Sequence, residues 1–142
     1  IQMLKYLVKS INKEYPTDRF ISANVEQMPY DNHEFDAIIS SAVLHFAEDK
    51  DHFMKMLHET VRVLKTKGIL FVRMAADVGM EKHIKPMGNG RYFLPDGSVR
   101  FLLTKEMLSE IMEIFGLSFI EPFKTVIVDD KRCMSTLVLR KG

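Results

Sequence analysis

One stretch, residues 27–74, constrains the fold of this chain more than any other. An apolar block at residues 37–39 ends in two serines, and apolar side chains then recur at helical spacing over residues 53–64. A second apolar run follows at residues 68–72. This order predicts a strand, an amphipathic helix and a second strand that is buried on both faces. Polar residues at the carboxyl end of the first strand mark the edge where open α/β sheets bind ligands.

The end of the predicted helix carries local signals. Lys65 and Lys67 fall in its expected last turn, where positive charge is favourable. Gly68 follows at the position of a left-handed C-terminal cap. We therefore expect the helix to run to this glycine.

The residues before this stretch predict a helix and a short strand. Apolar residues with helical spacing favour a helix from about Met3 to Glu14 that is packed on one side. The run Arg19–Ala23 has the composition of a short strand, and a turn-rich connection follows it.

Beyond Met74 the pattern first loosens and then becomes regular again. Residues 75–91 predict a loop or a partly ordered lid, and Pro95-Asp96-Gly97 predict a hairpin turn. Thr104 is a good N-cap for a helix that Gly116 closes.

Two apolar runs near the C-terminus, residues 123–128 and 133–139, flank a short charged turn. Strands joined so tightly must be antiparallel. Together with the alternation of strands and helices before them, they predict an α/β fold with a mostly parallel sheet and an antiparallel edge.

Composition narrows the classes of function. The chain has 142 residues, the length of one domain, and a formal net charge of +1, which gives no general attraction to nucleic acid or to an anionic membrane. Its single cysteine, Cys133, excludes an internal disulfide and favours a cytoplasmic protein. No apolar run is long enough to span a membrane, and the histidines show no spacing typical of a metal site.

Two segments carry a family resemblance, EQMPYDNHEFDAIISSAVLHF and HETVRVLKTKGILFVR. They resemble class I S-adenosylmethionine-dependent methyltransferases of the small-molecule, type 11-like branch. The resemblance implies a Rossmann-like sheet with a C-terminal antiparallel hairpin and S-adenosyl-L-methionine as cofactor. It also implies methyl transfer to a small-molecule acceptor by direct displacement. We expect residues 1–142 to form a single, partial methyltransferase domain with a lid-like insert at about 75–103.

The matched segments correspond to the later part of such a domain. The family's first two strands and its glycine-rich cofactor loop precede the matched region, so we expect a C-terminal portion that binds the cofactor poorly by itself. The strand at 36–44 would then be an unpaired edge, which favours self-association or disorder near the N-terminus. A non-catalytic, self-associating remnant of the fold is therefore the alternative. An unrelated nucleotide-binding domain is disfavoured because no phosphate-binding loop is present.

The resemblance also implies the cofactor contacts. Asn24, Val25 and Glu26 occupy the position of the adenine contacts, where a side-chain oxygen and a backbone N–H suit adenine. Ser40 and Ser41 occupy the position that lines the methionine end of the cofactor. The alternatives are ordinary turn chemistry for the first group and local backbone hydrogen bonds for the serines.

Three residues are candidates for chemistry or acceptor binding. His45 lies just past the strand exit and could orient or deprotonate an acceptor, although a lone histidine is more often a packed structural group. Arg91 and Tyr92 belong to a locally basic insert that could recognise an anionic or aromatic acceptor, or could simply be a solvated surface.

Overall fold

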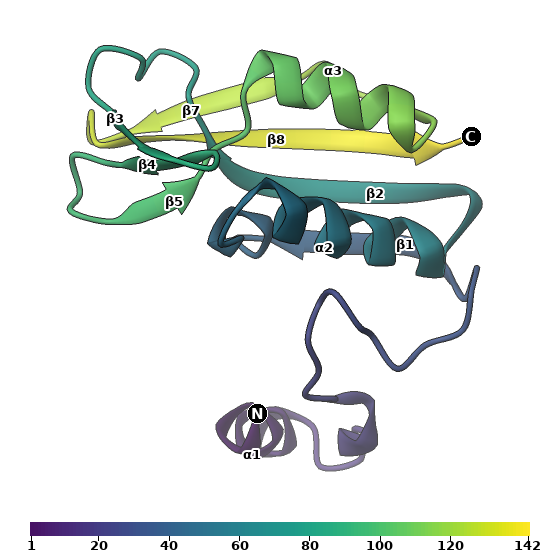
Figure 1. The fold of residues 1–142 in the computed structure, drawn as a ribbon. Coiled ribbons are helices and arrows are strands. Elements are labelled where there is room, and N and C mark those ends of the chain that lie inside the picture. Colours follow the sequence, from purple (N-terminus) through teal and green to yellow (C-terminus); the bar gives the residue numbers. More distant parts are fainter.

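The computed structural model describes all residues, 1–142, as one five-stranded sheet, one three-stranded sheet and three α-helices. Figure 1 shows both sheets and the helices. In chain order the elements are α1 (Gln2–Ile11), β1 (Phe35–Ser41), α2 (Lys50–Val63), β2 (Leu64–Ala76), β3 (Lys85–Gly88), β4 (Arg91–Phe93), β5 (Val99–Phe101), α3 (Lys105–Ile114), β6 (Leu117–Phe119), β7 (Lys124–Val128) and β8 (Arg132–Lys141).

The larger sheet has the strand order β1-β2-β8-β6, with β7 also paired to β8. β1 and β2 are parallel, and β8 runs antiparallel to β2, β6 and β7. The fold class predicted from the sequence, a Rossmann-like α/β sheet with a C-terminal antiparallel hairpin, is confirmed.

One face of this sheet carries the main core. Alternate residues of β2 and β8 point to that face, and α2 and α3 pack on it to form one cluster of 19 buried residues. The ring of Phe53 in α2 stacks on Phe101 in β5 with ring centroids 4.7 Å apart, and both side chains are fully buried. Burial of this amphipathic face explains why the helical periodicity was a sound guide to α2.

The opposite face of the sheet is only partly covered. The three-stranded sheet covers its end near Ala75, where Leu94, Leu102 and Met134 form a second buried cluster. Elsewhere this face is open, and Ile39 is 77% exposed. The prediction that residues 68–72 are buried on both faces is therefore wrong, because this part of β2 is open on its outer side, where Ile69 is 39% exposed.

The junction between α2 and β2 also differs from the prediction. The helix ends at Val63, and the left-handed residue is Lys67, with φ 64°, rather than Gly68. The backbone N–H groups of His33 and Glu34 donate to the carbonyls of Arg62 and Val63 at 2.9 Å and 2.8 Å. These bonds satisfy the last helical carbonyls from outside, so the chain leaves the helix before the glycine.

Two predictions about the N-terminal segment are wrong. α1 forms, but no residue in it is buried, and Figure 1 shows it standing away from the sheet. Its Tyr6 and Ile11 are 71% and 87% exposed. Residues 17–19 form a 3-10 turn and 20–23 are not a strand, because no neighbouring strand supplies backbone partners.

The C-terminal half follows the sequence prediction closely. Thr104 caps α3, its side chain accepting from the Met107 N–H at 3.2 Å, and Gly116 follows the helix with φ 58°. Both predicted hairpins form. The segment at 75–91 contains one strand that was not predicted, β3, and β6 was also missed. Both are short, at four and three residues, too few to give a clear periodic signal.

Candidate functional site

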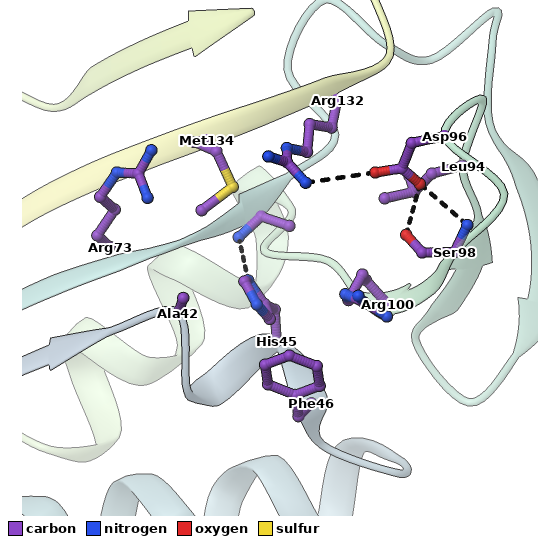
Figure 2. A pocket seen from close by; sticks show the side chains of 11 residues that line it. Ala42, His45, Phe46, Arg73, Leu94, Asp96, Ser98, Arg100, Arg132 and Met134 are labelled. Atoms are coloured by element: carbon purple, nitrogen blue, oxygen red, sulfur yellow. Dashed lines mark hydrogen bonds and ion pairs between the residues drawn. The ribbon is translucent and has the colours of Figure 1, made fainter. Parts of the chain in front are cut away.

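A cavity of about 220 Å³ lies where the ends of β1 and β2 meet the turn between β4 and β5. Figure 2 shows its side chains in close-up. Its walls come from the segment after β1, the outer face of β2 and β8, and the β4–β5 turn. The lining residues are Ala42, His45, Phe46, Arg73, Ala75, Leu94, Asp96, Ser98, Arg100, Arg132 and Met134.

The chain turns sharply after β1 and thereby builds one wall. Ala42 has φ 57°, and its N–H donates to the Arg73 carbonyl at 2.8 Å. A 3-10 turn over Leu44–Phe46 follows directly. This turn buries Leu44 in the core and presents His45 and Phe46 to the cavity.

His45 is a buried, neutral imidazole. Its Nδ1 accepts the N–H of Ala75 at 3.1 Å, so the proton of the neutral ring is on Nε2. Burial, followed by the positive charges of Arg100, Arg132 and Arg73, lowers the pKa of His45 to about 4. The ring can therefore donate a hydrogen bond from Nε2 near neutral pH, whereas its one lone pair is already engaged.

Asp96 is the single carboxylate of the cavity lining, and the β4–β5 turn holds it in place. Its Oδ1 accepts from the N–H of Ser98 at 2.9 Å and from the Ser98 hydroxyl, and its Oδ2 lies 3.5 Å from Nη1 of Arg132. Burial opposes ionisation, but the bonds from Ser98 and the charges of Arg132 and Arg100 outweigh it and lower the pKa of Asp96. The carboxylate is thus ionised and directed at one of the three arginines.

The other two arginines have no carboxylate partner. Arg100 lies over the ring of Phe46, with 4.7 Å from its guanidinium carbon to the ring centroid, and donates to the Val99 carbonyl at 2.8 Å. The guanidinium of Arg73 makes no ion pair, and no interaction is drawn from it in Figure 2. Arg73 and Arg132 lie on the two sides of Met134 in that view. The cavity consequently has an excess of positive charge.

The predicted cofactor residues lie outside this cavity. Ser41 is exposed and directly precedes Ala42 in the lining, whereas Ser40 is 8% exposed. Asn24 begins a turn in which its carbonyl accepts from the Gln27 N–H at 3.2 Å, and Val25 packs partly against the core. Glu26 lies 3.6 Å from the ring of His52.

The predicted acceptor residues are also not part of the lining. Arg91 lies on β4, and Tyr92 packs against the small cluster around Ala75 and Leu94. Of His45, Arg91 and Tyr92, only His45 lines the cavity, although Arg100 of the same basic insert lines it as well.

Sequence reasoning missed most of the charged lining. Arg73 carried a usable signal, since it is a charged residue near the carboxyl end of an otherwise apolar strand. Arg132 and Asp96 carried none, because in the sequence each belongs to a run of turn residues where charge is ordinary. No three histidine, cysteine, aspartate or glutamate side chains are grouped so that they could hold a metal ion. None of the helices has both the length and the apolar character needed to cross a membrane.

Comparison with known proteins defines the family. A family described as "Methyltransferase domain" matches residues 1–72, half of the chain, so the chain belongs to this methyltransferase family. Together with the fold, this makes it a class I, S-adenosylmethionine-dependent methyltransferase-like protein. A search of curated proteins gives no match.

Solved structures share the fold at low sequence identity. The PH0226 protein from Pyrococcus horikoshii is 12% identical, with a TM-score of 0.73 over all of this chain and 66% of that one. A SAM-dependent methyltransferase from Methanosarcina mazei is 14% identical, with a TM-score of 0.68 over 96% of this chain and 76% of that one. The N-methyltransferase NodS from Bradyrhizobium japonicum, in complex with S-adenosylhomocysteine, is 16% identical, with a TM-score of 0.60 over 89% of this chain and 58% of that one. The chain thus spans about two thirds or less of the length of PH0226 and NodS.

Proposed function

We propose that this chain forms the acceptor side of an S-adenosylmethionine-dependent methyltransferase acting on a small molecule. The observation that carries the proposal is the position of the cavity beside the carboxyl ends of β1 and β2. Ligands of open α/β sheets bind at that end. The 220 Å³ volume suits a small acceptor or one end of a longer one.

The groups proposed for cofactor binding have the chemistry that an adenosyl ligand needs. The N–H groups of Val25 and Glu26 make no hydrogen bond within the chain, and the side-chain amide of Asn24 is exposed. They can therefore meet the acceptor N1 and the donor N6 of adenine. Ser41, exposed next to the cavity, is the better placed of the two serines for the methionine end.

The bound cofactor would supply an electrophilic methyl carbon on a sulfonium. The protein's own part is alignment, since direct displacement requires the acceptor atom to lie in line with that carbon. We propose His45 as the catalytic residue that donates from Nε2 to the acceptor and fixes its orientation. A general base is not required by this chemistry, and the engaged Nδ1 supports an orienting role.

We also propose that residues 1–142 belong to one domain and that residues 75–103 act as a lid-like insert. In support, the insert contributes Leu94, Asp96, Ser98 and Arg100 to the cavity wall. Arg91 and Tyr92 would contact only an acceptor that extends beyond the cavity. The single cysteine, Cys133, which is free and buried, is compatible with a cytoplasmic protein.

A second candidate function is a non-catalytic, self-associating module of the same fold. The open edge of β1 and the exposed Ile39 favour it, because unpaired strand edges with apolar side chains associate readily.

Titration of the isotopically labelled chain with S-adenosylhomocysteine, followed by NMR, tests the methyltransferase proposal even if binding is weak. We expect shifts of the backbone amides of Asn24–Glu26 and Ser40–Ala42 at millimolar ligand. Ser41→Val should weaken these shifts, and Ser118→Val, an exposed serine in β6, is the matched control. Shifts confined to other regions, or no shifts at saturating ligand, would contradict the proposed cofactor site.

A further inference from the structure

The cavity beside His45 has a chemical character that narrows the class of acceptor. Building on the proposed methyltransferase function, we propose that Arg73, Arg100 and Arg132 bind the carboxylate or phosphate group of a small, partly apolar acceptor. This assigns an oxyanion site to a cavity that would otherwise be only a space next to the sheet.

The charge balance of the cavity is the first argument. Its lining contains three arginines, one aspartate and a histidine that is neutral near physiological pH. Asp96 lies near Arg132 only at 3.5 Å, and Ser98 engages its other oxygen. Two positive charges thus lack a carboxylate partner, and an oxyanion would supply one.

The origin of the guanidinium groups is the second argument. Arg73 comes from β2, Arg132 from the start of β8, and Arg100 from β5, so three separate strands contribute cationic side chains to the lining of one cavity. Figure 2 shows them around Met134 and His45. A guanidinium binds carboxylate and phosphate through paired N–H groups, whereas a solvated surface cation needs no such convergence.

The apolar side chains of the cavity wall indicate the character of the acceptor beyond its anionic group. Phe46, Leu94 and Met134 line the cavity together with the charged groups, and Phe46 is 58% exposed while Arg100 stacks on its ring. A compact apolar or aromatic body attached to the anion would cover these side chains. A long flexible polyanion would not fit a volume of about 220 Å³.

Some exposed cationic side chains elsewhere are paired with a carboxylate. Lys65, for example, is paired with Asp36 at 2.8 Å, and Lys50 with Glu110 at 2.8 Å. In each of these pairs the carboxylate balances the positive charge of the lysine. The cavity differs from these surface pairs because three arginines and several apolar side chains line the same space.

Binding of simple probes tests the proposal without the cofactor. We would titrate the labelled chain with benzoate, with phenyl phosphate and with the neutral isostere benzamide, and follow the amides of Ala42, Ala75, Ser98 and Met134 by NMR. We expect both anions to shift these amides and to bind at least about tenfold more tightly than benzamide. A preference for benzoate would indicate a carboxylate acceptor, and a preference for phenyl phosphate a phosphorylated one.

Matched variants locate the site. Arg73→Gln and Arg132→Gln should each weaken benzoate binding about tenfold. Arg140→Gln changes an exposed arginine on the same face of the sheet and should leave it unchanged. Circular dichroism of each variant establishes that it is folded, which is expected because Arg73 and Arg132 are exposed at the surface.

Each outcome has a definite meaning. Equal binding of benzamide and benzoate, or equal loss in Arg73→Gln and Arg140→Gln, would overturn the oxyanion site. Anion binding in a chain whose Ser40–Ala42 amides do not respond to S-adenosylhomocysteine would keep the oxyanion site and contradict the cofactor contacts proposed for these residues. The reverse result would keep the cofactor contacts and overturn the anionic acceptor.

Discussion

At the scale of single residues, His45 shows how the position of a side chain after a strand changes its protonation. The 3-10 turn after β1 leaves His45 only 7% exposed. Its ring packs against the Phe46 ring in the cavity that three arginines also line. Its Nδ1 is held by the Ala75 N–H. Because the surroundings disfavour the imidazolium, the ring stays a neutral donor over the whole physiological range.

This environment predicts a pH dependence of stability. The pKa of His45 is lowered from 6.5 to about 4, so the unfolded chain binds the proton more readily. The contribution to stability is complete above about pH 6.5 and is lost as the pH falls to about 4. The loss is about 3 kcal/mol at most. Chemical denaturation across this range measures it.

His45→Gln keeps an acceptor for the Ala75 N–H but cannot titrate, so its stability should vary less over that range. His58→Gln, at an exposed position, is the control. Glu59 titrates in a lower window, since hydrogen bonding by Arg62 lowers its pKa from 4.5 to about 2. Equal pH dependence of the wild-type chain and His45→Gln would show that His45 is not a buried neutral group.

At the scale of elements, turns and caps decided where strands and helices end. The α2–β2 junction is the clearest case, because the Gly68 cap signal was overridden by backbone bonds from residues 33 and 34. Those bonds join segments about 30 residues apart, which no local pattern contains. The β4–β5 hairpin, in contrast, was predictable because its turn residues act locally.

The turn between β3 and β4 offers an element-scale prediction. Gly90 has φ 80°, and a Cβ there would overlap the ring of Phe101, which stacks on Phe53 in the core. Gly97 has nearly the same φ, 82°, but faces open space. Both alanine variants carry the backbone strain of a positive φ, about 1 kcal/mol. Gly90→Ala should lose a further 1–3 kcal/mol, roughly, from the clash with Phe101.

Thermal or urea unfolding of the two glycine variants gives this difference directly. The comparison cancels the backbone term, so the remainder reports the contact with Phe101. Equal destabilisation of Gly90→Ala and Gly97→Ala would mean that the β3–β4 turn is not packed closely against Phe101.

At the scale of the whole molecule, much of one face of the sheet and its β1 edge are open. β1 is paired on one side only, Ile39 and Ile69 are 77% and 39% exposed, and the amphipathic helix α1 covers neither. Apolar surface of this kind drives association. The exposed apolar side chains at the β1 edge therefore favour self-association over a stable monomer.

We expect the chain to self-associate through β1. In sedimentation velocity its apparent mass should rise with concentration, and Ile39→Lys should shift it toward monomer, since an edge lysine opposes strand pairing. Val126→Lys, at a 61% exposed position on β7 at the opposite edge, should have no such effect. A wild-type chain that sediments as a monomer at every concentration would refute association through this edge.

The sequence by itself determined those parts of the protein that depend on neighbouring residues. Helical periodicity specified α2, the cap at Thr104 specified α3, and turn chemistry specified the two hairpins. The motif around β1 and α2 was enough to indicate the methyltransferase family. Each of these signals lies within a short window, where side-chain spacing and backbone preference act directly.

The tertiary structure alone decided which residues meet. Arg19–Ala23 has a strand-like composition but no neighbouring strand to pair with, and α1 has an apolar face but nothing beneath it. The register of β2 with β8 sets Ala75 opposite Met134, which puts Arg73 and Arg132 on the two sides of Met134 in the lining of one cavity (Figure 2). Sheet register joins residues far apart in the chain, so the cationic site beside His45 became visible only after the strands were paired.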